Sequence, residues 1–162
     1  MTQSLPQVAH EHHERLLQHI DRMPAVADGL MTDKADDIRA NVAEMGTFIG
    51  GTLVPHVDSA EAALYPELER MFQNRHSMAP MRREHDEIRR LSKEYARIAG
   101  EIGDGHVTLG RTLALRRVMF QLYALVKVHL AEEEAYLRIV EHGVAADTAD
   151  VLAAALEHPV AG

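Results

Sequence analysis

Apolar residues recur at steps of three and four along most of this 162-residue chain. Because an α-helix turns once every 3.6 residues, this spacing gathers them on one helical face. The pattern predicts four long amphipathic helices, at about 7–30, 33–72, 80–102 and 107–141. A shorter apolar pattern at about 149–156 predicts a tail helix on the outside.

Glycine and proline mark the predicted interruptions. In the second helix, Gly50–Gly51, Pro55 and Pro66 predict a bend or break, since proline removes a helical hydrogen bond. Three glycines within residues 100–106 mark a clear loop. Four long helices joined by short loops indicate an all-α fold, an up-down-up-down four-helix bundle with a short C-terminal helix.

Length and composition agree with one domain over 1–162, with a core at about 8–142 and a tail at 143–162. The absence of cysteine excludes a disulfide scaffold, a thiolate-bound iron–sulfur cluster and a thiol nucleophile. A net charge of −8 without a basic cluster argues against a nucleic-acid partner. No apolar segment approaches the length of a bilayer span, so we expect no membrane partner and a soluble, cytoplasmic protein.

Histidine is the compositional outlier, with eleven residues in the chain. His13, His85 and His129 each lie three or four residues from apolar stripe positions of their predicted helices. His56 lies in the second helix, directly after Pro55. Each of the four helices therefore contributes one inward histidine, which is how cofactor sites are built inside bundles.

Two carboxylates accompany these histidines. Glu133 lies four residues after His129, one turn along the same face. Glu61 lies five residues after His56, about 140° away from it around a regular helix. Glu61 would thus need a local widening of the helix, or a bridging position, to take part in a site.

A hydrogen-bonded core is the alternative explanation for a single inward histidine. Four such residues on four helices favour metal binding instead, because unpaired buried polar groups cost free energy. Imidazole and carboxylate without thiolate suit iron, manganese or zinc. Among the other histidines, His12 and His19 lie on one face of the first helix, and one of them could replace His13. We expect His76 to be a cap or surface residue, and assign no role to the remaining ones: His10, His106, His142 and His158.

Four segments in order resemble the helices of the hemerythrin-like (HHE) family. They read EHHERLLQHID, PHVDSAEAALYPEL, MRREHDEIRRL and VKVHLAEEEAYL, and the likeness covers roughly residues 8–140. The resemblance implies a non-haem iron pair between the helices. It assigns the ligands to five residues: His13, His56, His85, His129 and Glu133.

The chain departs from the family at two positions. Ala60 stands four residues after His56, where the family usually has a bridging glutamate, and Glu61 follows it. Met81 stands one turn before His85, where oxygen-carrying hemerythrins have another histidine. These departures count against reversible oxygen carriage, and leave room in the ligand shell for water, a tyrosine or another carboxylate.

Two functions from different classes remain open. In the first, two Fe ions, held by the five ligands and Glu61, bind, sense or reduce a small oxidant: O2, NO or hydrogen peroxide. In the second, the chain is a helical interaction or regulatory module with a polar His/Glu core and no redox metal. Enzyme status stays open, because a carrier and a peroxidase can share ligands and differ in the surrounding residues.

Overall fold

The computed structural model describes residues 5–140, with side chains from residue 10 to residue 139, and every regular element in this range is a helix. The predicted all-helical class is confirmed, while the predicted tail helix lies outside the described residues. The elements are α1 (Leu5–Ile20), α2 (Met23–Gly29), α3 (Ala35–Phe48), η1 (Ile49–Leu53), α4 (Val54–Ser59), η2 (Ala60–Leu64), α5 (Tyr65–Met71), α6 (Ala79–Asp104) and α7 (Leu109–Val140).

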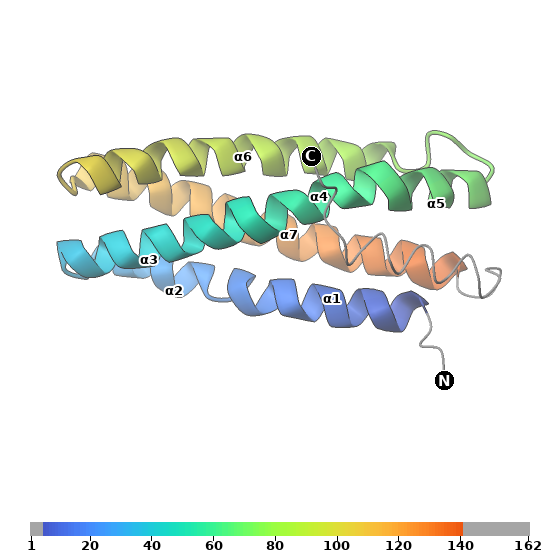
Figure 1. The fold of residues 1–162 in the computed structure, drawn as a ribbon, viewed down its shortest axis with the longest axis horizontal. Coiled ribbons are helices and arrows are strands. Elements are labelled where there is room, and N and C mark those ends of the chain that lie inside the picture. The colour runs from blue at the N-terminus through green and yellow to red at the C-terminus, as the bar shows by residue number, and fades with distance from the viewer. Residues whose placement is uncertain (1–4, 141–162) are drawn as a thin grey trace.

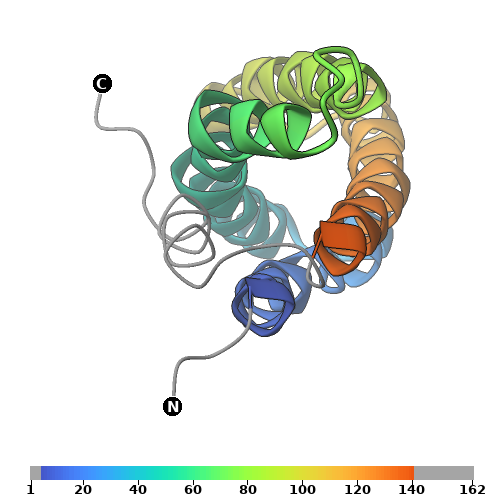
Figure 2. The same ribbon diagram turned by 90° about the vertical axis from the view of Figure 1, so that its right-hand side faces the viewer.

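The helices lie in long rows with a common interior. One row holds α1 and α2, the next holds α3 to α5, and α6 and α7 each form a row of their own (Figure 1). Successive rows run in opposite directions (Figure 1), and seen end-on they surround the interior (Figure 2). The row of α7 contacts α1, α2 and α6, and α3 contacts α6.

The first row is divided where one helix was expected. The chain makes a turn at Asp21–Arg22, and α2 begins at the next residue. The cause is Pro24, whose ring would clash with the carbonyl of Ile20 and which has no N–H to donate there. As the second residue of α2, Pro24 is tolerated, because first-turn N–H groups have no helical partner.

The second row contains two widened turns. In η1 the N–H of Val54 bonds the carbonyl of Ile49, and in η2 the N–H of Tyr65 bonds the carbonyl of Ala60. Both are five-residue π-type bonds, and each turn is followed closely by a proline, Pro55 or Pro66. The predicted interruption is confirmed, but it takes the form of widened turns within a continuous row.

Two apolar clusters fill the interior. In α6 the smaller cluster includes Met81 and the larger begins at Ile88; in α7 the larger ends at Leu130 and the smaller includes Leu137. The layer between the clusters is occupied by buried polar side chains. Buried polar groups are costly unless they have partners, so this layer is where a functional site is to be sought.

The longest helix, α7, has 32 residues, but charged side chains interrupt its apolar stretches. A bilayer span needs about 20 predominantly apolar residues in succession. No helix within residues 5–140 meets this requirement.

Candidate metal centre

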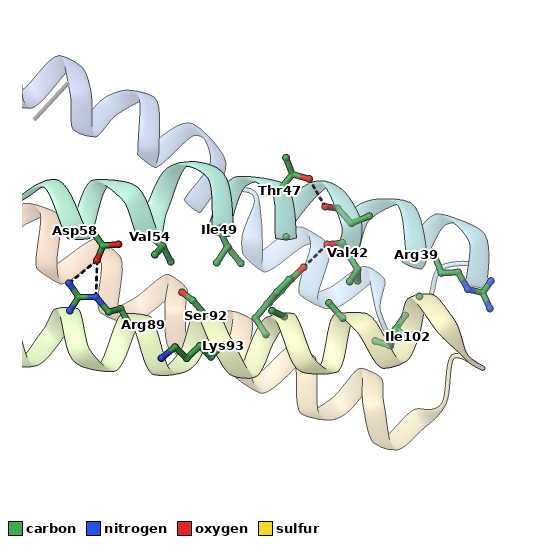
Figure 3. Close-up of a pocket in the computed structure, with 17 residues that line it drawn as sticks. Arg39, Val42, Thr47, Ile49, Val54, Asp58, Arg89, Ser92, Lys93 and Ile102 are labelled. Carbon is green, nitrogen blue, oxygen red and sulfur yellow. Dashed lines mark hydrogen bonds and ion pairs between the residues drawn. The ribbon is translucent and has the colours of Figure 1, made fainter. Parts of the chain in front are cut away.

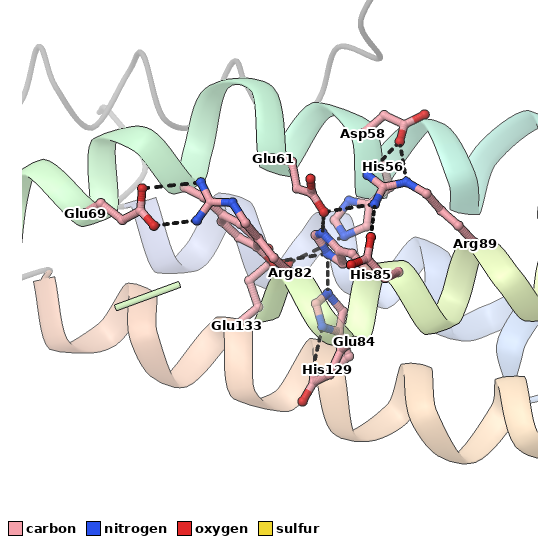
Figure 4. A network of polar contacts seen from close by, with 12 residues as sticks. His56, Asp58, Glu61, Glu69, Arg82, Glu84, His85, Arg89, His129 and Glu133 are labelled. Carbon is pink, nitrogen blue, oxygen red and sulfur yellow. Dashed lines mark hydrogen bonds and ion pairs between the residues drawn. The ribbon is translucent and has the colours of Figure 1, made fainter. Parts of the chain in front are cut away.

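Five buried side chains meet in the polar layer. They come from every row: His13 from α1, His56 from α4, His85 from α6, and His129 and Glu133 from α7. None is more than 4% exposed. Figure 4 shows His56, His85, His129 and Glu133 directed into the space between the helices.

Glu133 belongs to two groups of possible ligands. It joins His13 and His56 on one side and His85 and His129 on the other, and in each triad the three ligating atoms lie within 4.8 Å of one another. Its Oε2 lies 3.0 Å from His13 Nε2 and 3.5 Å from His56 Nε2. One carboxylate thus stands between two pairs of imidazoles.

Outer carboxylates fix two of the rings. Glu61 Oε1 lies 2.9 Å from His85 Nδ1, and Glu84 Oε2 lies 2.9 Å from His129 Nδ1 (Figure 4). Because an ionised carboxylate only accepts hydrogen bonds, each Nδ1 carries the proton and each Nε2 presents a lone pair inward. These two Nε2 atoms are 2.9 Å apart, a repulsive arrangement that a cation between them would relieve.

The other two rings have weaker outer partners. His56 Nδ1 lies 3.0 Å from His12 Nε2, and His13 Nδ1 lies 3.7 Å from Glu134 Oε1, too far for a hydrogen bond. Burial, with His56 and His13 nearby, lowers the pKa of His12 to about 3. His12 is therefore neutral at physiological pH and can share one proton with His56.

Protonation states suit metal binding. Burial, reinforced by His129, lowers the pKa of His85 to about 2, and burial also lowers the pKa of His56. Burial alone would raise the pKa of Glu133, but the hydrogen bond from His13 and the nearby ring of His56 hold it well below its usual value. Neutral imidazoles and an ionised carboxylate are the forms that ligate metals.

Tyr65 is a further member of the site. Its hydroxyl lies 3.1 Å from His85 Nε2, and its ring stacks on that of His85 with centroids 5.1 Å apart. The side chain is fully buried, and the guanidinium of Arg82 lies over its ring. Burial and the nearby Glu133 raise the pKa of Tyr65, so the phenol keeps its proton.

The polar atoms of the site are incompletely satisfied by protein partners. Within residues 10–139, five buried side-chain atoms lack a hydrogen-bond partner, and three of them belong to this cluster: His13 Nδ1, His56 Nε2 and Glu133 Oε1. Each such atom costs about 1–3 kcal/mol. A cation that takes the lone pairs of His56 Nε2 and Glu133 Oε1 would remove two of these costs. The donor set therefore fits a metal.

Glu61 lies at the edge of the centre. The N–H of Ala60 bonds the carbonyl of His56 as in a regular helix, and the widened turn η2 follows, with Glu61 as its second residue. Its side chain is 25% exposed, bonds both His85 Nδ1 and Arg89 Nη1, and is in neither triad. Its role as a ligand stays a prediction. Ala60 and Met81, the two departures from the family pattern, are buried in the smaller apolar cluster.

The remaining histidines lie elsewhere. His19 stacks on Phe48, and His76 is exposed with its N–H donating to the side chain of Asn74. Of the candidates for the α1 ligand, His13 contacts Glu133, and His12 contacts His56 from outside. His106 is exposed, and the last two, His142 and His158, lie outside the described residues.

Sequence reasoning missed three residues of the centre: Tyr65, Glu84 and Glu134. Glu84 directly precedes His85 yet bonds His129 on another helix, and Glu134 directly follows Glu133 yet lies near the ring of His13. Adjacent helical residues point about 100° apart, so spacing along one helix does not reveal such partners. Tyr65 had a signal, because it lies within the quoted segment of the second helix.

The family comparison agrees with this geometry. The sequence model of the Hemerythrin HHE cation binding domain matches residues 6–103. The chain belongs to this hemerythrin family. The match contains His13, His56 and His85 of the candidate centre, while His129 and Glu133 lie beyond it in α7. No curated protein and no solved structure matches the chain. The predicted family is confirmed, and it is a cation-binding one.

Proposed function

We propose that this hemerythrin-family chain is a non-haem di-iron protein that binds, senses or reduces a small oxidant: O2, NO or hydrogen peroxide. The observation that carries the proposal is the position of Glu133, which is shared by two buried pairs of histidines. A carboxylate shared in this way suits a pair of cations, because each of its oxygens has two lone pairs. The site would use His13, His56, His85, His129 and Glu133 as ligands.

The donor set favours iron. Each triad consists of two histidines and one carboxylate, the combination that non-haem iron takes with coordination positions left open. Family membership points the same way. Two bound irons would supply the electrons and open coordination positions for a small oxidant, while the chain's own residues determine what reaches them.

The enclosure of the site limits its ligand to a small molecule. The five ligating residues are almost fully buried, and the apolar neighbours Leu64, Leu68 and Met81 are inaccessible to solvent. An apolar surround favours uncharged diatomic molecules or peroxide over charged or bulky substrates. It also keeps bulk water from the open positions.

The other residues of the centre would orient the ligating rings and interact with a bound oxidant. Glu61 and Glu84 hold the Nδ1 protons of His85 and His129, which fixes ring orientation and raises the basicity of each Nε2. The Tyr65 hydroxyl, 3.1 Å from His85 Nε2, keeps its proton and could donate a hydrogen bond to a bound oxidant. The scaffold that we propose for these positions is an up-down-up-down four-helix bundle.

The alternative function, a metal-free interaction module with a polar core, explains the centre less well. A metal-free core would leave Glu133 Oε1 and His56 Nε2 without partners and the lone pairs of His85 and His129 facing each other. Natural cores satisfy nearly all buried polar groups. The alternative nevertheless gives a clear contrasting outcome for the following measurement.

Metal analysis of protein purified without an affinity tag tests the proposal. We expect two irons per chain and near-ultraviolet absorption from oxygen-to-iron charge transfer, which hydrogen peroxide or NO should change. Folded, metal-free protein that takes up no iron on reconstitution would support the interaction module. One tightly bound ion per chain would refute the shared-carboxylate reasoning.

A further inference from the structure

A separate groove of about 840 Å³ lies between the α3–α4 row and α6. It runs beside α6 from Arg89 to Gly103, fifteen residues spanning roughly 21 Å of helix (Figure 3). None of the five proposed metal ligands lines it. Its volume is within the range of about 300–1,000 Å³ typical of small-molecule sites.

Apolar or small residues line most of its length. Val42, Ile49, Ala96 and Ile102 are among them. Gly50 also lines the groove, and a Cβ added there would meet no atom within 4 Å. Val42, Ile49 and Ile102 are at most 2% exposed, and the Tyr95 hydroxyl donates a hydrogen bond to the Val42 carbonyl at 2.8 Å. An unbranched apolar chain would therefore lie over the small residues of the groove.

One part of the groove is polar and unsatisfied. The hydroxyl of Ser92 points from α6 toward the α3–α4 row (Figure 3). The residue is only 6% exposed, and its hydroxyl has no hydrogen-bond partner among the described residues. Lys93 lines the groove next to it, and within residues 10–139 no carboxylate pairs with its ammonium. Asp58, an acidic residue that also lines the groove, is paired at 2.9 Å with Arg89, which Glu61 and Asp86 contact as well.

We propose that the groove binds an unbranched aliphatic monocarboxylate. Its head group would accept hydrogen bonds from the Ser92 hydroxyl and the Lys93 ammonium, and its tail would lie over Ala96 and Ala99 toward Gly103. A carboxylate is the complement of two unpaired donors, one of them charged. Each tail methylene removed from water tightens binding by about fourfold, so affinity depends on chain length.

Calorimetric titration of the purified protein with dodecanoate, below its micelle concentration, tests this proposal. We expect saturable one-to-one binding, roughly fifteenfold weaker binding of decanoate, and no measurable binding of acetate. Lys93→Gln should weaken dodecanoate binding at least fivefold and leave binding of the uncharged dodecanol unchanged. Arg83→Gln is the matched control, because it removes an exposed positive charge of α6 outside the groove.

Steric variants test the position of the tail. Gly50→Leu should abolish dodecanoate binding by filling the groove, whereas Gly51→Leu, in the same widened turn but outside the groove, should not. If Gly50→Leu lacks the native circular dichroism spectrum, Ala96→Leu makes the same test from α6. The proposal would be overturned if dodecanoate shows no saturable binding. It would also be overturned if the Lys93 variant or the groove-filling variant binds dodecanoate as tightly as the parent protein does. Because these readouts need no metal, failure here leaves the proposed iron site standing.

Discussion

Glu61 and Glu133 are both acidic residues of the centre, but the structure predicts different consequences for their removal. Glu133 belongs to both triads, so Glu133→Ala should lose at least one ion per chain even at saturating metal. Of the proposed ligands, Glu61 contacts His85, at its outer nitrogen and 2.9 Å away, and it also bonds Arg89. Glu61→Ala should therefore weaken metal binding without changing how many ions bind at saturation.

The size of the Glu61 effect follows from its role. Loss of an outer partner of a ligating histidine costs about 10–100-fold in metal affinity, or about 1.4–2.7 kcal/mol. At fixed free iron, stability falls by nearly the same amount, because bound metal adds RT ln(1 + [L]/Kd) to the free energy of unfolding. For a chain of 162 residues this lowers the melting midpoint of the iron-loaded protein by very roughly 3–10 °C.

Competition against a chelator of known affinity, with iron counted per chain, measures both quantities. Glu84→Ala is the matched control, because Glu84 holds His129 as Glu61 holds His85, at the same distance. The two variants should behave alike. If Glu61→Ala loses a whole ion at saturation while Glu84→Ala keeps both, Glu61 is itself a ligand and the assigned outer role is wrong.

Three further predictions follow from the same geometry. His56→Ala, His85→Ala and His129→Ala should each lose at least one ion per chain by elemental analysis, while His106→Ala, which alters an exposed side chain, should lose none. Chelation should lower the melting midpoint by roughly 5–10 °C and leave far-ultraviolet circular dichroism helical, since the apolar clusters remain; identical midpoints would contradict metal binding. The stability of the chelated protein should fall below pH 6.5. A histidine in the unfolded chain takes up a proton near that pH, whereas the pKa of folded His85 is about 2. Acid therefore lowers the free energy of unfolding by up to about 1.4 kcal/mol per pH unit for each histidine whose pKa is lowered in this way. Urea titration at pH 7.5 and 5.5 measures the change.

The inward histidines could be found from sequence because their positions depend on helical period alone. His13, His85 and His129 lie in step with apolar residues of their own helices, and all three are buried. Partners on another helix follow from packing that no single helix encodes, as for Glu84 with His129. The division of the first row could have been predicted from Pro24, whose ring is incompatible with an uninterrupted helix.

Glu61 is the second residue of η2, and this leads to a last prediction. A π-type bond spans one residue more than an α-helical bond, so η2 amounts to one extra residue in the row. Deletion of Ala60 would remove this extra residue and place Glu61 four residues after His56, which is the family's usual spacing. The helix after η2 would keep its present position. We expect this variant to fold and to bind two ions with affinity within about tenfold of the parent. Deletion of Ala43 from regular α3 is the control, and it should be far more damaging, since it rotates one side of the row by about 100° relative to the other. Equal loss of folding in both deletions would mean that η2 is required by the surrounding packing and does not simply absorb an additional residue.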